Sequence, residues 1–157
     1  MLKKSKSLII ILFITFSSSA LAGWVTRLNI PSWYESLNKL SFSPPNWIFA
    51  PVWTTLYLMM SIAIWNVYEN AKSKREGNKL LIYYFGHLFI NFAWSFVFFY
   101  FHLIFLAFIN ILFLIIAIIV LMAIYFPRSK VSFYLMIPYL LWVLFAGTLN
   151  FGLYLIN

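Results

Sequence analysis

Cysteine is absent from the 157-residue sequence, and only three acidic residues occur in it. Without a thiol the chain forms no disulfide, thiolate nucleophile, iron–sulfur cluster or zinc–cysteine site. None of the acids, Glu35, Glu69 and Glu76, lies in the middle of a long apolar stretch, and aspartate is missing. A proton-coupled exporter needs a carboxylate inside the membrane. The sequence therefore argues against that class and offers no carboxylate pair for hydrolysis.

Metal ligands and nucleic-acid signatures are equally sparse. The two histidines, His87 and His102, are far apart in the sequence, so we expect no metal site. We interpret His87 as a hydrogen-bonded packing residue rather than a haem ligand. The net charge is +8, but no basic patch alternates with stacking residues. We therefore expect no nucleic-acid partner.

Apolar residues make up 64% of the chain and charged residues 9%, whereas a soluble domain has roughly 45–50% and about 25%. A membrane span needs about 20 apolar residues, and the chain has enough for five. The sequence predicts an all-α membrane protein, a five-transmembrane-helix bundle that forms one domain over residues 1–157. Its helices are expected at 7–25, 47–68, 80–101, 103–126 and 131–156, and a long connection at 27–46.

The basic residues predict the orientation of this bundle in a membrane. If five helices alternate in direction, the two basic residues Arg27 and Lys39 face one side and the other nine face the opposite side. Cytoplasmic loops carry the excess of Lys and Arg, so the N-terminus is expected in the cytoplasm and Asn157 outside. The first stretch has an alternative interpretation as a signal peptide cleaved before Gly23, because Ala20-Leu21-Ala22 is typical of a cleavage site.

Aromatic residues are abundant: 7 Trp, 10 Tyr and 18 Phe. Their spacing, together with Pro51 and Pro138, suggests an uncharged, aromatic-walled pocket for a flat apolar ligand, although helix packing alone also produces such stripes. A mid-span amide such as Asn91 needs a partner in another helix or in a ligand. Three helix faces carry the pattern: Trp53, Tyr57 and Ile64; His87, Asn91, Trp94 and Phe98; and Tyr139, Trp142, Ala146 and Leu149.

Several motifs occur in the order and spacing of a known family. The sequence from Trp33 onward resembles the tryptophan-rich sensory protein (TspO) family, also called the translocator protein family. The matching segments are Trp33-Tyr34, Leu37-Asn38-Lys39, Ser43-Pro44-Pro45-Asn46-Trp47, Pro51-Val52-Trp53-Thr54-Thr55-Leu56-Tyr57, Asn91-Phe92-Ala93-Trp94, Pro138 to Ala146, and Thr148-Leu149-Asn150.

The resemblance implies a five-helix bundle, assembled as a homodimer in a prokaryotic cytoplasmic membrane, with membrane lipids as neighbours and a ligand cavity near the first loop. Its small-molecule partners would be tetrapyrroles, with porphyrin or haem as a ligand and no obligatory cofactor. The protein would then act as a sensor, scavenger or carrier. Carried over by position, the ligand-binding residues are Tyr34, Pro44, Pro45, Trp47, Trp53, Tyr57, Asn91, Trp94, Ile111, Trp142, Ala146 and Leu149.

Two alternative functions stay open under the same resemblance. One is a light- and oxygen-dependent porphyrin-degrading enzyme, in which Trp53 and Trp142 are the candidate catalytic residues. The other is a small transporter of apolar cargo such as sterols. The sequence also departs from the family, because Leu40 stands where a proline is usual and Asn110 where an acid is common. The missing proline predicts a looser first loop.

Overall fold

The computed structural model describes residues 2–157, with side chains from Lys6 onward. Five of its helices are long and apolar enough to cross a membrane, and no strand occurs in the described range. A 3-10 turn η1 (Tyr34–Ser36) lies between the first two helices, and a π-helical segment η2 (Phe96–Tyr100) extends the third. The five helices are α1 (Leu2–Asn29), α2 (Asn46–Glu69), α3 (Lys74–Ser95), α4 (Ile104–Tyr125) and α5 (Lys130–Ile156).

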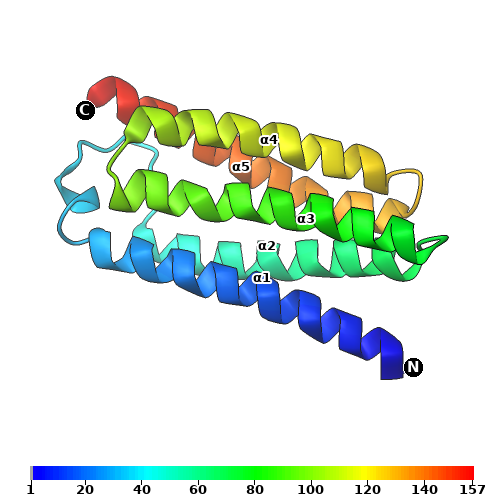
Figure 1. Ribbon diagram of the computed structural model, residues 1–157. Coiled ribbons are helices and arrows are strands. Elements are labelled where there is room, and N and C mark those ends of the chain that lie inside the picture. Colours follow the sequence, from blue (N-terminus) through cyan, green and yellow to red (C-terminus); the bar gives the residue numbers. More distant parts are fainter. Residues whose placement is uncertain (1) are drawn as a thin grey trace.

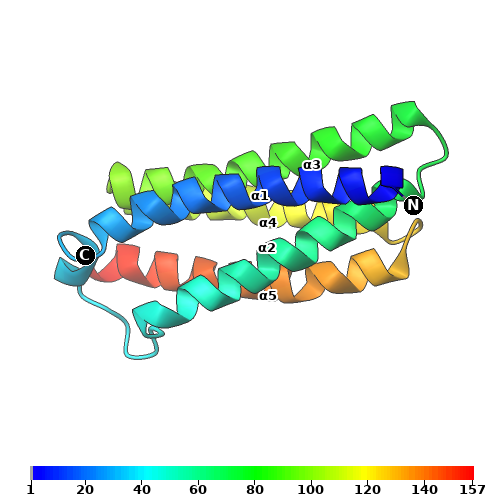
Figure 2. The ribbon, with the colours of Figure 1, turned by 90° about the horizontal axis from the view of Figure 1, so that it is seen from below.

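Successive helices run in opposite directions along one bundle (Figure 1). The N-terminus lies at the same end of the bundle as the α2–α3 and α4–α5 turns. We call this end the charged end. The C-terminus, the α1–α2 loop and the α3–α4 turn lie at the opposite end (Figures 1 and 2). Helix α1 packs on α2 and α3, while α5 packs on α2 and α4. The predicted five-helix architecture is therefore confirmed.

Two helices are longer than hydropathy predicts. Helix α3 begins at Lys74 rather than at 80, because the Oγ atom of Ser73 accepts a hydrogen bond from the Glu76 N–H at 3.2 Å and caps the first turn. The charged segment expected as a loop over 70–79 is therefore mostly helical. Helix α1 continues past 25 to Asn29, whose side-chain amide donates to the Val25 carbonyl at 2.9 Å. The first connection is correspondingly shorter than 27–46.

Large side chains fill the half of the bundle next to the charged end, which we call the closed half. They come from four helices and interlock without access to solvent, as in the close-packed interior of other proteins. The opposite half, which contains the cavity described below, is called the cavity half. Fully buried side chains of the closed half include Met60, Ile64, Val67, Tyr84, Ile118, Leu121, Tyr125 and Met136.

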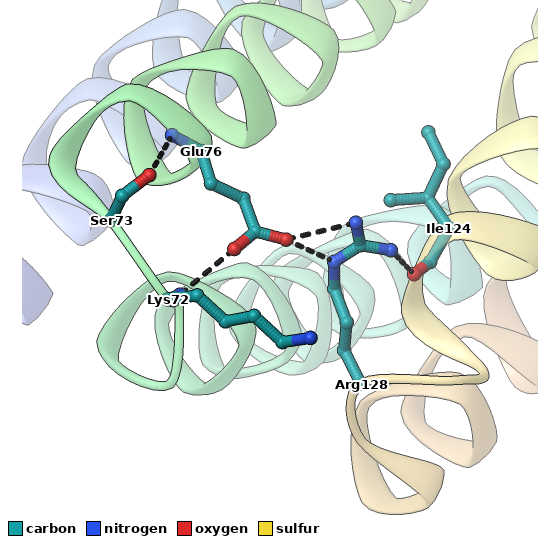
Figure 3. A network of polar contacts seen from close by, with 5 residues as sticks. All are labelled: Lys72, Ser73, Glu76, Ile124 and Arg128. Atoms are coloured by element: carbon teal, nitrogen blue, oxygen red, sulfur yellow. Dashed lines mark hydrogen bonds and ion pairs between the residues drawn. The ribbon is translucent and has the colours of Figure 1, made fainter.

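An ion pair joins the two turns at the charged end (Figure 3). The Glu76 carboxylate accepts hydrogen bonds from Arg128 Nε at 3.0 Å and from the Lys72 backbone N–H at 2.8 Å. Arg128 Nη1 also donates to the Ile124 carbonyl at 2.7 Å. The pair is partly exposed, so its contribution to stability is small. Its effect is to fix the α2–α3 turn against the α4–α5 turn.

Candidate functional site

A cavity of about 440 Å³ occupies the other half of the bundle. Its lining residues come from α1, α2, α3, η2 and α5, with Ile30 and Tyr34 from the first loop. The volume falls in the range of small-molecule sites, which is about 300–1,000 Å³. Most of the lining surface is apolar. The aromatic lining residues are Tyr34, Phe49, Trp53, Tyr57, Trp94, Phe98, Phe99 and Trp142.

Small side chains on α1 create the space. Ser19, Ala22, Gly23 and Thr26 lie on the face of α1 that lines the cavity, as their spacing of three and four residues requires. A Cβ atom added to Gly23 would meet no atom within 4 Å. Helix α1 therefore forms a wall without filling the volume in front of it.

The π-helical segment brings two neighbouring phenylalanines to the same wall. Phe101 N–H bonds to the Phe96 carbonyl at 2.9 Å, five residues back, which widens the turn. Phe98 and Phe99 are both buried, and both line the cavity. The Trp94 ring stacks on Phe98, with centroids 5.3 Å apart and an interplanar angle of 16°. The Phe99 ring stands edge-on to both, with interplanar angles of 88° to Trp94 and 76° to Phe98, so this aromatic wall has a corner.

The opposite aromatic wall comes from α2 and α5. Trp53 stacks on Tyr57, with centroids 5.5 Å apart and planes inclined by 30°. The Phe49 ring meets Trp142 edge-on at 5.9 Å. Aromatic pairs of this kind gain about 0.5–1.5 kcal/mol beyond the burial of their area. They hold the ring faces in place before any ligand enters.

A chain of hydrogen bonds runs from the cavity into the bundle. Tyr57 O–H donates to Asn91 Oδ1 at 2.7 Å, and Asn91 Nδ2 donates to the Tyr139 hydroxyl oxygen at 2.9 Å. His87 Nδ1 faces the Tyr84 carbonyl at 3.2 Å, which can only accept. In the neutral ring His87 Nε2 is then the acceptor, and the Tyr139 O–H donates to it at 2.8 Å. The chain fixes which way the Asn91 amide points.

Two tryptophan N–H groups at the cavity differ in their partners. Trp94 Nε1 donates to Asn150 Oδ1 at 3.1 Å, so its ring is held by α5. Trp142 Nε1 is buried and has no hydrogen-bond partner in the described part of the chain. A buried donor without an acceptor costs about 1–3 kcal/mol. The Trp142 side chain lines the cavity, but this nitrogen atom is itself buried within the bundle.

The structure brings together most of the ligand-binding residues predicted from the sequence. Pro44, Pro45, Trp47 and Ile111 are the exceptions, because none of them lines the cavity. Trp47 lies in the first turn of α2 with its side chain 72% exposed, and Ile111 is buried on α4 against Gly147. The predicted residues that do line it are Tyr34, Trp53, Tyr57, Asn91, Trp94, Trp142, Ala146 and Leu149.

Sequence reasoning missed the contribution of α1. Its small residues lie on one helical face, and this spacing could have indicated a lining role. Arg27, in the last turn of the helix, also lines the cavity. Other lining residues outside the predicted set include Phe49, Phe98, Phe99, Asn150 and Leu153.

The first loop is attached to the bundle at several points. Trp33 stacks on His102, with centroids 4.3 Å apart and planes 14° apart, and His102 has a φ of 58°. Asn38 N–H donates to Asn157 Oδ1 at 2.9 Å. Leu40, which replaces the usual proline, lies so close to Gly152 that an added Cβ would overlap it. These contacts hold the loop beside the cavity.

A five-helix membrane bundle with an aromatic cavity at one end is the class that the fold and site define. The chain belongs to the TspO/MBR family, whose model matches residues 9–155. It is 35% identical to tryptophan-rich protein TspO of Archaeoglobus fulgidus, over 99% of this chain and 97% of the relative. It is 30% identical to protein CrtK of Rhodobacter capsulatus, over 90% of this chain and 89% of that relative. It is 32% identical to the translocator protein of Homo sapiens, over 76% of this chain and 71% of that relative. The resemblance stated from the sequence is therefore confirmed.

Proposed function

We propose that this integral membrane protein binds a porphyrin- or haem-type tetrapyrrole in its aromatic cavity and acts as a sensor, scavenger or carrier. The observation that carries the proposal is the cavity itself, whose lining includes eight aromatic side chains from four helical segments and the first loop. A flat apolar ligand matches such a lining. The homodimer implied by the resemblance remains a prediction.

The proposed binding mode uses ring faces rather than a protein ligand to iron. His87 is engaged by Tyr139 and Tyr84, and His102 stacks on Trp33. No histidine, cysteine or methionine is among the lining residues that the structure describes. We therefore expect metal-free protoporphyrin and its iron form to bind with affinities within a few-fold of each other. A large preference for the iron form would contradict this mode.

A titration of the purified full chain in detergent tests the function. Protoporphyrin binding is followed by the shift of its Soret band and by quenching of tryptophan fluorescence. Trp142→Phe should weaken binding about threefold to tenfold, because the smaller ring loses part of an aromatic contact that contributes about 0.5–1.5 kcal/mol. Trp47→Phe is the matched control, since Trp47 is exposed and lies outside the cavity lining. Wild-type protein that does not bind protoporphyrin would overturn the proposal.

Light-dependent breakdown of the bound porphyrin, with molecular oxygen as the oxidant, is the second proposal. It is favoured by the position of Trp53 and Trp142, the two candidate catalytic residues, which both line the cavity. Illumination of the porphyrin complex should then cause a loss of absorbance that stops when oxygen is removed. The double variant Trp53→Phe/Trp142→Phe should lose this reaction. Equal rates in the wild type and the double variant would leave only the binding function.

A further inference from the structure

Arg27 is the only charged side chain among the residues that line the cavity. It lies in the last turn of α1, at the end of the bundle that carries the first loop. The neighbouring polar lining residues, Thr26, Asn46 and Thr54, are neutral. A single cation at one end of an otherwise uncharged cavity makes the site electrically asymmetric.

No acid of the described chain neutralises Arg27. Glu69 and Glu76 lie at the charged end of the bundle, where Glu76 pairs with Arg128. Glu35 is exposed in the first loop, and among the side chains described from Lys6 onward Arg27 has no ion-pair or side-chain hydrogen-bond partner. Its guanidinium is therefore available to a ligand.

A second cation lies beside the same end of the cavity. Lys39 Nζ stands 4.9 Å from the centroid of the Tyr34 ring, and that ring lines the cavity. Burial raises the pKa of the Tyr34 phenol, so Tyr34 stays neutral and gives neither cation a counterion. Two cations and a neutral phenol therefore border the cavity beside the first loop.

We infer that the cavity selects ligands that combine a flat apolar body with a carboxylate at its edge, and that Arg27 is the counterion of that carboxylate. A guanidinium matches a carboxylate with two parallel hydrogen bonds, and its charge is felt more strongly beside an apolar cavity than in water. Lys39 provides a weaker, second position for an anionic group. This inference rests on the proposed tetrapyrrole function and adds the charge of the ligand to it.

The test compares protoporphyrin, which carries two carboxylates, with its dimethyl ester, which has the same macrocycle without the charges. Wild-type protein should bind the diacid about tenfold more tightly than the ester. Arg27→Gln should remove this preference by weakening only the diacid, and Arg27→Lys should restore part of it. Arg75→Gln, an exposed arginine at the charged end, is the matched control and should change neither affinity.

The outcomes separate this inference from the function on which it rests. If the wild type binds both compounds equally and Arg27→Gln changes neither affinity, Arg27 contacts lipid headgroups instead and only the inference fails. If Arg27→Gln weakens both compounds equally, the residue supports the helix rather than the carboxylate, and the inference again fails. If the wild type binds neither compound, the proposed function itself is overturned.

Discussion

In the closed half, large side chains such as Met60, Ile64 and Tyr125 are fully buried between the helices. In the cavity half, α1 presents Ser19, Gly23 and other small residues to aromatic side chains that lie across an open volume. Both halves are built from the same apolar helices. The difference shows that the size of the side chains on one helix face, and not overall hydrophobicity, decides where this bundle can hold a ligand.

Unpaired polar atoms alone do not distinguish the halves. Tyr125 OH and Ser132 Oγ in the closed half lack partners in the described chain, as does Trp142 Nε1 at the cavity. Neither Tyr125 nor Ser132 lines the cavity, whereas the Trp142 side chain does. An unpaired polar atom is therefore no sign of a binding position by itself.

The two ends also differ in charge, and this difference gives the prediction with the largest effect. Nine basic residues belong to the segments at the charged end, and only Arg27 and Lys39 belong to the segments at the other end. Of these nine, Lys3 and Lys4 precede the residues whose side chains the structure describes. A reporter fused after Asn157 should therefore be active only outside the cytoplasm. Cytoplasmic activity of that fusion would reverse the assignment of the two ends.

Packing in the closed half gives the second prediction. Ile118→Ala should lower the free energy of unfolding by about 2–5 kcal/mol, because Ile118 is fully buried and the change leaves a void. Ile116→Ala is the same substitution two positions away on α4, where the side chain is 57% exposed. It should change stability by less than about 0.5 kcal/mol. Similar losses for both variants in detergent unfolding would show that the closed half is not tightly packed.

The sequence predicts the positions of the helices in both halves better than it predicts where each helix begins. Long apolar stretches predict all five helices, because the backbone of a membrane span must satisfy its hydrogen bonds within a helix. The third and fourth stretches have no charged segment between them, so the break near His102 is marked less clearly than the others. The start of α3 was missed, since Lys74 and Arg75 look like a polar loop. The spacing of Ser73 and Glu76, which is typical of a helix cap, could have placed it.

Most of the residues predicted for the candidate site on α2, α3 and α5 line the cavity, whereas Pro44, Pro45, Trp47 and Ile111 do not. Residues such as Trp53 and Asn91 lie on helical faces whose direction follows from periodicity. Pro44 and Pro45 precede α2 in a connection, and spacing does not determine how a loop turns relative to a cavity. The small residues of α1 were missed because a lining role there depends on which helix lies opposite, which only the packed structure shows.

The hydrogen-bond chain at the cavity leads to the third prediction. Asn91→Leu removes the acceptor of Tyr57 and the donor to Tyr139, so it should lower stability by about 1–3 kcal/mol and also weaken porphyrin binding. The double variant Asn91→Leu/Tyr57→Phe should cost less than the sum of the two single changes. Strictly additive losses would mean that the two side chains act independently. Unchanged affinity with lower stability would restrict Asn91 to packing.

Filling the cavity should make it resemble the closed half. Ala146 lines the cavity one turn after Trp142, so Ala146→Phe should weaken protoporphyrin binding at least about tenfold, which corresponds to about 1.4 kcal/mol. Ala123→Phe is the control, because Ala123 is exposed on α4. Both variants should keep the thermal stability of the wild type within a few degrees. Undiminished affinity in Ala146→Phe would place the ligand elsewhere.

The smallest expected effect concerns the loop that lies beside the cavity half. A Cβ at Gly152 would overlap the Leu40 side chain, whereas a Cβ at Gly86 would meet nothing within 4 Å. Both glycines lie inside helices, where alanine is favoured by about 0.5–1 kcal/mol. Gly86→Ala should therefore raise stability by about that amount, and Gly152→Ala should gain less, because Leu40 must move.

Displacement of Leu40 should also act on the ligand. With the Trp33–His102 stack and the Asn38–Asn157 hydrogen bonds still in place, the loop should remain attached but shift near Leu40. Porphyrin should then dissociate from Gly152→Ala a few-fold faster than from Gly86→Ala, as measured by stopped-flow fluorescence. In a Leu40→Ala background, where the overlapping atoms are absent, Gly152→Ala should raise stability by as much as Gly86→Ala does in the wild type. If the double variant keeps the deficit, the loss arises inside α5, and the contact between Leu40 and Gly152 does not hold the loop.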